Sequence, residues 1–378
     1  MEVVVERRKN AFTLIELLVV IAIIALLIGI LLPALGQAKR SALNVVSISN
    51  MKSLNTGSAN YAADNSDRIY SYTWRGGVSY MIPGVPKAKT GTDDGDAAAF
   101  QNMDILIRAT GRSAGDYRII KFRGRLPHRR YSHLVLLDFL TDVQPEPIAA
   151  SPFDRNLLDW QADQRAYKDD LAGSNLPYAN GVPGPGYDQD ARWEDLAVLM
   201  RWPFASSYQT VPAAWNSDGI AGAPTFIPVS GTPHLFQDAP GGAPLGRRRY
   251  TQVAHPSGKV HTFEEFDRFS DKDGLYFAYP EAKPNLGFFD GSVRSESSAD
   301  SNPGWNPDTP ADEWRQRYIP LETFPLPKDG LEDNTVEYCQ RFRWTRHGLQ
   351  GIDYGGRDVG RRQYNLPQEP AEGCEVGN

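Results

Sequence analysis

The sequence predicts an α+β protein in which one long N-terminal helix precedes a loop-rich antiparallel β-sheet body. Residues 17–32 contain no polar side chain, and helix-type spacing of apolar residues continues to about residue 63. The chain contains 34 glycines and 28 prolines, more than soluble domains average, which favours loops over a helical bundle. Asp290-Gly291 lies between apolar residues, and this dipeptide is typical of a β-hairpin turn.

The apolar run near the N-terminus is long enough to cross a membrane. At about 1.5 Å per residue, a helix over residues 12–32 is roughly 30 Å long, which matches the hydrocarbon core of a bilayer. Its single charged residue is Glu16. A charge at the centre of a membrane span costs about 2.5–3.5 kcal/mol, so Glu16 indicates a function. The alternative is an ordinary anchor in which this side chain reaches the interface.

The flanks of the run decide between kinds of targeting segment. Basic residues 7–9 precede it and hold the N-terminus in the cytoplasm, so the rest of the chain is exported. A secretory signal peptide has an apolar region of about 7–15 residues followed by a small-x-small cleavage site. This run is longer and continues smoothly into residues 35–39, and no cysteine follows it as a lipoprotein signal requires.

The basic residues 7–9, the sequence FTLIEL at residues 12–17 and the long apolar helix together resemble the prepilin signal of type IV pilins and type II secretion pseudopilins. The resemblance implies that a prepilin peptidase cuts between Ala11 and Phe12 and then methylates the new N-terminus. It makes Glu16 the fifth residue of the mature chain. One position departs from the family pattern, because Ala11 stands where the family usually has glycine.

The same resemblance implies an assembly mechanism. When a subunit moves from lipid into a filament core, the new amine of Phe12 becomes buried, and a buried cation is costly without a partner charge. Glu16 of a neighbouring subunit can supply that charge and so set the axial register. Pro33 lies where many family members have a helix-kinking proline. The predicted assembly residues are therefore Phe12, Glu16 and Pro33.

The family shape is a lollipop, a long helix packed on a globular head. It implies a leader peptide at residues 1–11, a membrane-spanning or filament-core half-helix at 12–35, an amphipathic half-helix at 36–64 and an exported α+β head at 65–378. Apolar residues of the second half-helix are expected to face the head (Leu43, Val46, Ile48, Met51, Leu54 and Tyr61). Ser47 is among the polar residues expected to face water.

Within the head, the clearest β signals are a strand at 259–263 and a hairpin at 287–294, with a further strand candidate at 68–74. We expect residues 131–140 to form a short buried helix. The hairpin resembles the C-terminal motif of large prepilin-like proteins, in which a histidine precedes Asp-Gly by nine residues. Pro280 stands in place of that histidine, so the hairpin carries over and the histidine's role does not. The arginine-rich residues 341–362 are expected to form a basic, loop-rich tail.

Cys339 and Cys374 are the two cysteines of the chain. An even number in an exported protein suggests one disulfide, and two unpaired thiols are the alternative. Many type IV pilins have a C-terminal disulfide loop, so the resemblance also implies this pair, which would fix the tail.

The remaining chemistry points away from an enzyme. The net charge is −6, without the basic surplus of a nucleic-acid-binding protein. Asp271 and Asp273 have a fragment of calcium-loop spacing, but apolar residues 275–277 occupy the places of further ligands, so a solvated acidic turn is preferred. The histidines lack zinc spacing, and neither a Gly-x-Ser-x-Gly elbow nor a phosphate-binding loop is found. We expect no cofactor and no metal, with calcium as the one weak candidate.

The expected function is that of a structural subunit of a type IV pilus or a type II secretion pseudopilus. Its implied partners are the prepilin peptidase and N-methyltransferase, other pilin or pseudopilin subunits and the inner membrane. The chain would be a single-pass inner-membrane protein before assembly, with a cytoplasmic N-terminus and a periplasmic or extracellular head. The alternative is a membrane-tethered exported domain that binds glycan or protein and does not polymerise.

Overall fold

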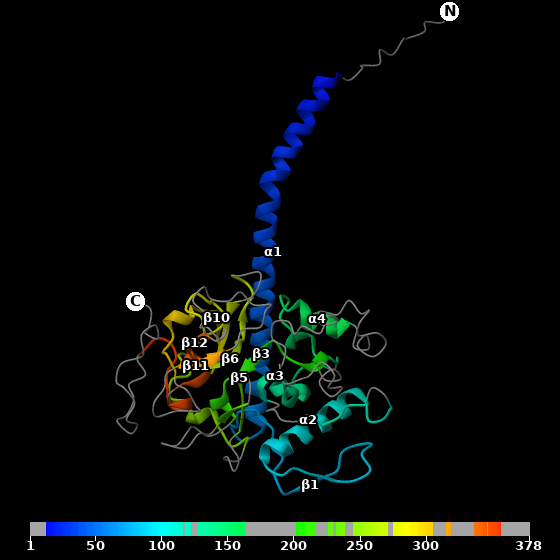
Figure 1. Ribbon diagram of the computed structural model, residues 1–378, viewed down its shortest axis with the longest axis vertical. Coiled ribbons are helices and arrows are strands. Elements are labelled where there is room, and N and C mark those ends of the chain that lie inside the picture. Colours follow the sequence, from blue (N-terminus) through cyan, green and yellow to red (C-terminus); the bar gives the residue numbers. More distant parts are fainter. Residues whose placement is uncertain are drawn as a thin grey trace, which may run out of the picture. The chain divides into compact units, whose positions relative to one another are not determined.

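The computed structural model describes residues 13–115, 118–121, 128–141, 143–162, 202–215, 226–229, 232–238, 245–270, 275–304, 315–318, 336–345 and 347–356. The chain divides into two compact units, Met1–Val45 and Val46–Asn378. A long N-terminal helix is followed by antiparallel sheets, which confirms the predicted α+β class (Figure 1). The domain boundaries expected from the sequence stay predictions.

Helix α1 spans Leu14–Asp64. It runs through Pro33 without interruption, although proline has no N–H and one intrahelical hydrogen bond is therefore missing there. The bend expected at Pro33 stays a prediction. The helix ends at the predicted stop, where Ser66 and Asp67 have φ values of 57° and 65°. Positive φ values are incompatible with continued right-handed helix.

The other described helices belong to the second unit and are shorter than α1. Helix α2 begins after Asp93, whose carboxylate accepts the backbone N–H of Asp96, and ends before Gly111, which has a φ of 70°. Asp93 is therefore the N-cap of this helix and Gly111 its C-cap, and both residue types are common at these positions. The α-helices are α2 (Asp94–Thr110), α3 (His128–Tyr131) and α4 (Arg155–Ala162). The 3-10 helices are Ser132–Phe139, Pro147–Ala149, Trp202–Phe204, Pro212–Ala214, Tyr250–Gln252, Ser298–Asp300, Arg341–Trp344 and Gly348–Gln350.

The predicted helix at 131–140 is therefore present as a 3-10 helix.

All described strands pair antiparallel. The main sheet has the order β10-β9-β6-β3 and consists of β3 (Tyr208–Thr210), β6 (Val260–Glu264), β9 (Asn285–Phe288) and β10 (Val293–Ser295). The two-stranded pairs are β1 (Ser79–Tyr80) with β2 (Lys89–Thr90), β4 (Phe226–Val229) with β5 (Thr232–Asp238), β7 (Phe266–Asp267) with β8 (Leu275–Tyr276), and β11 (Arg315–Tyr318) with β12 (Val336–Cys339).

The predicted Asp-Gly hairpin is confirmed as β9–β10, in which Val293 pairs with Gly287. Its turn differs from the two-residue turn that the dipeptide predicts. The N–H of Phe288 bonds to the carbonyl of Ser292, and the N–H of Gly291 bonds to the carbonyl of Phe288. Gly291 alone in this loop has a positive φ, 82°. The turn is therefore a three-residue loop that ends in a left-handed glycine.

The strand predicted at 68–74 is wrong, since this segment makes only an isolated bridge between Arg68 and Arg249. Its backbone is satisfied by loops and side chains instead of by a neighbouring strand. The N–H groups of Thr73 and Trp74, for example, both donate to Oε1 of Gln101. Its large apolar and aromatic side chains (Ile69, Tyr70 and Tyr72) are buried in the core without belonging to a strand.

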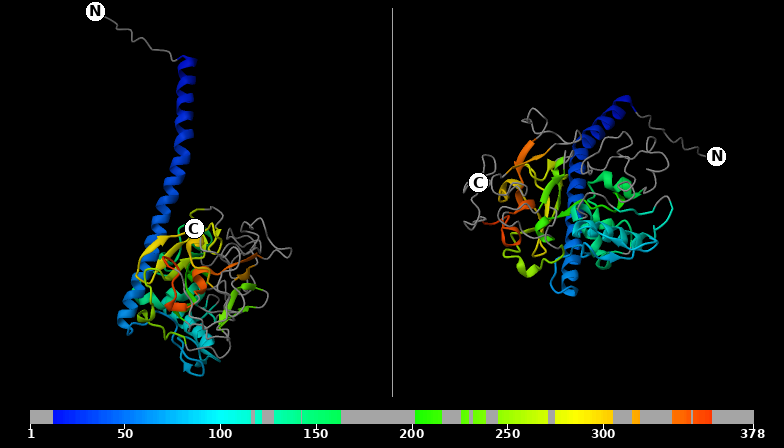
Figure 2. Two further views of the ribbon diagram at one scale, coloured as in Figure 1. Left: turned by 90° about the vertical axis from the view of Figure 1, so that its left-hand side faces the viewer. Right: turned by 60° about the horizontal axis from the view of Figure 1, so that its bottom comes forward.

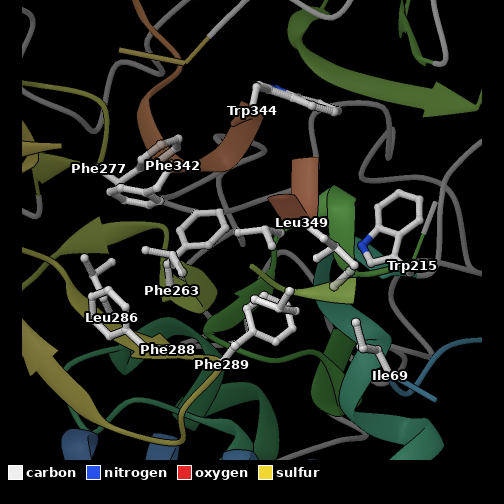
Figure 3. Packing of buried hydrophobic residues seen from close by; sticks show 14 of the residues in the cluster. Ile69, Trp215, Phe263, Phe277, Leu286, Phe288, Phe289, Phe342, Trp344 and Leu349 are labelled. Atoms are coloured by element: carbon white, nitrogen blue, oxygen red, sulfur yellow. The ribbon is translucent and has the colours of Figure 1, made fainter. Parts of the chain in front are cut away.

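Two large hydrophobic cores and a small cluster of Met51, Leu54 and Tyr208 lie in the described part of the second unit. The larger surrounds the main sheet, and Figure 3 shows its aromatic residues from several distant segments packed together. Phe263, Phe277 and Phe342 pack against one another in it, with ring centroids 5.0–5.4 Å apart. The smaller core joins α2, α4 and the 3-10 helices near Leu134 and Trp202. The C-terminal part of α1 runs along the boundary between these two groups of elements (Figure 2).

The arginine-rich end was expected to be a basic, loop-rich tail, but its first residues form a buried 3-10 helix. Arg341 and Arg343 are buried in the 3-10 helix Arg341–Trp344. Arg341 donates to the carbonyl of Ser301, and Arg343 donates to the hydroxyl of Tyr276. Four tryptophans of the described residues are also buried (Trp160, Trp202, Trp215 and Trp344).

We expect acid to destabilise the second unit because two of its histidines are buried. Burial lowers the pKa of His133 and of His261 to about 3. In the unfolded chain each regains its ordinary pKa of about 6.5 and binds a proton below it. Stability should therefore fall as pH drops from 6.5 toward 3, by up to about 1.4 kcal/mol per pH unit for each histidine.

The measurement is urea unfolding of the full chain in detergent at pH 7.5 and pH 5. His261 stacks on Phe289, with ring centroids 4.3 Å apart, so His261→Phe retains a ring there without a titrating group. This variant should lose part of the pH dependence, and an unchanged pH dependence would contradict the assignment. Burial raises the pKa of Glu264, so this carboxyl group affects the pH dependence of stability in the direction opposite to the histidines. Comparing the wild type with His261→Phe cancels this contribution, because both proteins contain Glu264.

Candidate assembly site

The first turn of α1 contains a reciprocal pair of side-chain caps. The carboxylate of Glu16 accepts the backbone N–H of Thr13 at 2.9 Å and the Thr13 hydroxyl at 2.8 Å. The backbone N–H of Glu16 in turn donates to the Thr13 hydroxyl at 3.2 Å. This is a capping box, which satisfies N–H groups that a helix start leaves without partners. Both of these bonds to the carboxylate go to its Oε2 atom.

The sequence pattern Thr-x-x-Glu is the known signature of this motif, and it could have been read at residues 13–16. The prediction treated Glu16 only as a partner for a neighbouring subunit. The structure adds an interaction within the subunit that orients the same carboxylate at the beginning of the helix.

The helix beyond Glu16 exposes an unbroken apolar surface. Every large apolar side chain between residues 14 and 35 is exposed, from 44% at Val20 to 80% at Leu14. An 18-residue window of α1 has a mean hydropathy of 3.2, and none of it is buried. Length and composition therefore allow this helix to cross a membrane. An apolar surface of this extent needs a lipid or protein partner.

The other predicted site residues are placed as follows. Pro33 lies inside α1. Ala11, Phe12, Asp271, Asp273 and Cys374 lie outside the described residues. Cys339, the last residue of β12, is buried and disulfide-bonded; its pairing with Cys374 stays a prediction. In the described part of the chain, no group of three or more His, Cys, Asp or Glu side chains could hold a metal ion.

The C-terminal part of α1 is fixed in the second unit by buried hydrogen bonds. Ser47, which was expected to face water, is fully buried. Its hydroxyl donates to Oε1 of Glu264 on β6 at 2.6 Å and lies 2.9 Å from the hydroxyl of Tyr208 on β3. The small polar side chain is required here because the main sheet presents a buried carboxyl group to the helix. Val46, expected to face the head, is exposed instead.

Two further contacts connect α1 to the hairpin region. The Nζ of Lys52 donates to the carbonyl of Gly291 at 2.6 Å. Thr262 of β6 donates to Oδ1 of Asn55 at 3.2 Å. The Asp-Gly turn and the centre of the sheet are therefore both in contact with the helix.

The close packing of helix α1 on the main sheet depends on the absence of a side chain at Gly287. A Cβ at this position would lie 2.4 Å from Oγ1 of Thr262 and 2.6 Å from Nδ2 of Asn55. Both side chains are buried and cannot move away freely. Gly287→Ala should therefore lower the free energy of unfolding by about 1–3 kcal/mol, the usual effect of overpacking. Gly36→Ala is the matched control, because no atom lies within 4 Å of its added Cβ.

Urea unfolding of the full-length variants in detergent measures both effects. The control should unfold at the wild-type urea concentration or above it, since alanine favours helix over glycine. Equal stability of Gly287→Ala and the wild type would mean that the helix does not lie against β9 as described.

Comparison with known families identifies one motif. The model of the prokaryotic N-terminal methylation motif matches residues 7–32. This match confirms that the chain carries a prepilin-type N-terminal signal, and together with the apolar helix it suggests membrane anchoring. No curated protein and no solved structure matches the chain. The motif is a structural signal of pilin-type proteins, which suggests a structural and not a catalytic role.

Proposed function

We propose that this protein is a structural subunit that a prepilin peptidase cuts between Ala11 and Phe12 and then methylates at Phe12. The mature chain assembles through its N-terminal helix into a type IV pilus or a type II secretion pseudopilus. The observation that carries the proposal is the methylation motif at residues 7–32, with one carboxylate in an otherwise uncharged span.

The geometry of α1 supports a step from lipid to filament. In a bilayer, the exposed apolar side chains between residues 14 and 35 contact lipid. In a filament they contact the same surface of other subunits. The capping box holds the Glu16 carboxylate at the start of the helix. It can there accept a charge-assisted hydrogen bond from the methylated amine of Phe12 on a neighbouring copy.

The orientation belongs to the same proposal. Basic residues 7–9 hold the N-terminus in the cytoplasm, and residues beyond the span are exported to the periplasm or the cell surface. The partners are then the peptidase, other pilin or pseudopilin subunits and the inner membrane. No role for a cofactor is part of the proposal.

Mass spectrometry of the mature N-terminus tests the processing step. The chain is expressed with a prepilin peptidase, and the N-terminal peptide should begin at Phe12 and carry one methyl group. Ala11→Gly restores the usual family residue and should be processed at least as completely. A purified protein that still begins at Met1 under these conditions would overturn the proposal.

A membrane-tethered binding domain is the second candidate, and one observation favours it. Trp74 and Tyr80 stack with centroids 4.0 Å apart and planes 7° apart, and the neighbouring Val78 and Met81 are exposed. Aromatic faces beside apolar side chains can hold a sugar ring or a peptide. This function needs anchoring alone, so it would survive substitution of Glu16, whereas assembly would not.

A further inference from the structure

A buried amine, a carboxyl group and a hydroxyl group meet beneath the main sheet. Lys259 directly precedes β6, and its Nζ lies 2.9 Å from Oδ2 of Asp353, with exposed fractions of 0% and 1% for the two side chains. Nζ also donates to the hydroxyl of Thr345. That hydroxyl donates to Oδ1 of Asp353 at 2.5 Å. Each of the three groups therefore contacts the other two.

The surroundings of this cluster exclude water. Val260 follows Lys259 in the chain, and the backbone carbonyl of Lys259 accepts the N–H of Phe289. The Thr345 hydroxyl also donates to the carbonyl of Phe342. These residues are buried. A pair of opposite charges at such a site is costly to desolvate, and transfer of one proton from Nζ to the carboxylate turns it into a neutral amine and a neutral acid. The neutral pair is the form in which an amine attacks a carboxyl carbon.

The two carboxyl oxygens are held differently, as such an attack requires. Oδ2 of Asp353 accepts the backbone N–H of Val260 at 2.8 Å. This donor would stabilise negative charge that develops on Oδ2 when the carboxyl carbon becomes tetrahedral. Oδ1 receives the Thr345 hydroxyl and is the oxygen that can leave as water. Fixed contact between amine and carboxyl group also replaces a collision between separate molecules.

We propose that Lys259 and Asp353 become joined by an intramolecular isopeptide bond. The lone pair of neutral Nζ attacks Cγ of the protonated carboxyl group, and the N–C bond forms. Thr345 accepts one proton from Nζ and passes its own proton to Oδ1. The C–Oδ1 bond then breaks, and one water molecule leaves. The product is a secondary amide with Oδ2 as its carbonyl oxygen, Thr345 is regenerated, and no oxidant or other reactant is consumed.

The bond would connect the start of β6 to the segment after the 3-10 helix Gly348–Gln350. It would resist unfolding as a disulfide does, by restricting the unfolded chain, but it would also survive reduction. This cross-link is independent of the proposed assembly, and it would serve a subunit that carries mechanical load.

The test is the intact mass of the purified full chain after denaturation and reduction. The wild type should be lighter than its sequence mass by one water molecule, whereas Lys259→Arg should have its full mass, because a guanidinium group does not form this amide. Digestion of the wild type should give a branched peptide that contains both Lys259 and Asp353. Thr345→Val should slow or abolish the reaction, and Thr345→Ser should retain it.

A succinimide at Asp353 also removes one water molecule, and the digest separates the two products. A succinimide leaves Lys259 in a linear peptide that trypsin cleaves, which would overturn the proposal. A wild type of full mass would overturn it equally. Since the wild-type peptides alone decide the question, a variant that fails to fold does not weaken the test.

Discussion

Glu16→Leu is expected to stop the protein from entering filaments while leaving its membrane insertion intact. Removing the carboxylate leaves the buried amine of a neighbouring Phe12 without its partner. Loss of one partner of a buried ion pair typically costs about 3–5 kcal/mol, which corresponds to at least about a hundredfold less incorporation. Insertion itself becomes easier, because an apolar side chain replaces the charge in the span.

Thr13→Ala is the matched control, since Glu16 also caps the helix through Thr13. This variant removes the capping hydroxyl and retains the carboxylate. Loss of a cap costs about 1 kcal/mol, so incorporation should fall by several fold at most. The measurement is the amount of subunit in sheared filaments relative to the membrane fraction. Equal losses in both variants would assign the role of Glu16 to capping, and an unchanged Glu16→Leu would contradict polymerisation through this residue.

Asp154→Ala is expected to have the largest effect on the stability of the second unit. Oδ2 of Asp154 accepts hydrogen bonds from Arg268 at 2.9 Å and from Ser207 at 2.8 Å, and Oδ1 accepts the N–H of Leu157. The ion pair is buried, with side-chain exposures of 8% for Arg268 and 6% for Asp154. Its removal should lower the free energy of unfolding by about 3–5 kcal/mol.

Glu296→Ala provides the comparison. Its pair with Arg294 is short, 2.6 Å, but both side chains are about one-third exposed. Solvent screens such a pair, so its loss should cost less than about 1 kcal/mol. Urea unfolding of full-length protein in detergent gives both values. If the two variants were equally stable, burial would not be what makes the Asp154 interactions strong.

Local patterns in the sequence predicted the elements that depend mainly on neighbouring residues. Helix α1 was predicted because its apolar spacing continues for fifty residues or so and ends at a polar turn. The β9–β10 hairpin was predicted from Asp290-Gly291, although its loop has three residues and not two. The segment at 68–74 is rich in residues that favour strands, yet it makes only an isolated bridge, because pairing cannot be read from one segment alone.

The candidate site could likewise be predicted only where local sequence reveals it. Glu16 is visible because a charge in an apolar run is rare. Ser47 was assigned to the solvent because serine usually is exposed. Its partner Glu264 lies 217 residues away, and no local pattern connects the two. The burial of Arg341 and Arg343 has the same cause, since their acceptors Ser301 and Tyr276 come from other segments.

The bonded Cys339 has a consequence for how this protein is made. Reductants in the cytoplasm keep thiols reduced, so a newly synthesised precursor still facing that compartment lacks this link. In the proposed life cycle, β12 becomes covalently fixed only after the chain reaches an oxidising environment. A recombinant head produced in an ordinary bacterial cytoplasm would therefore have an unlinked β12, and secretion or an oxidising host strain should yield the more protease-resistant material.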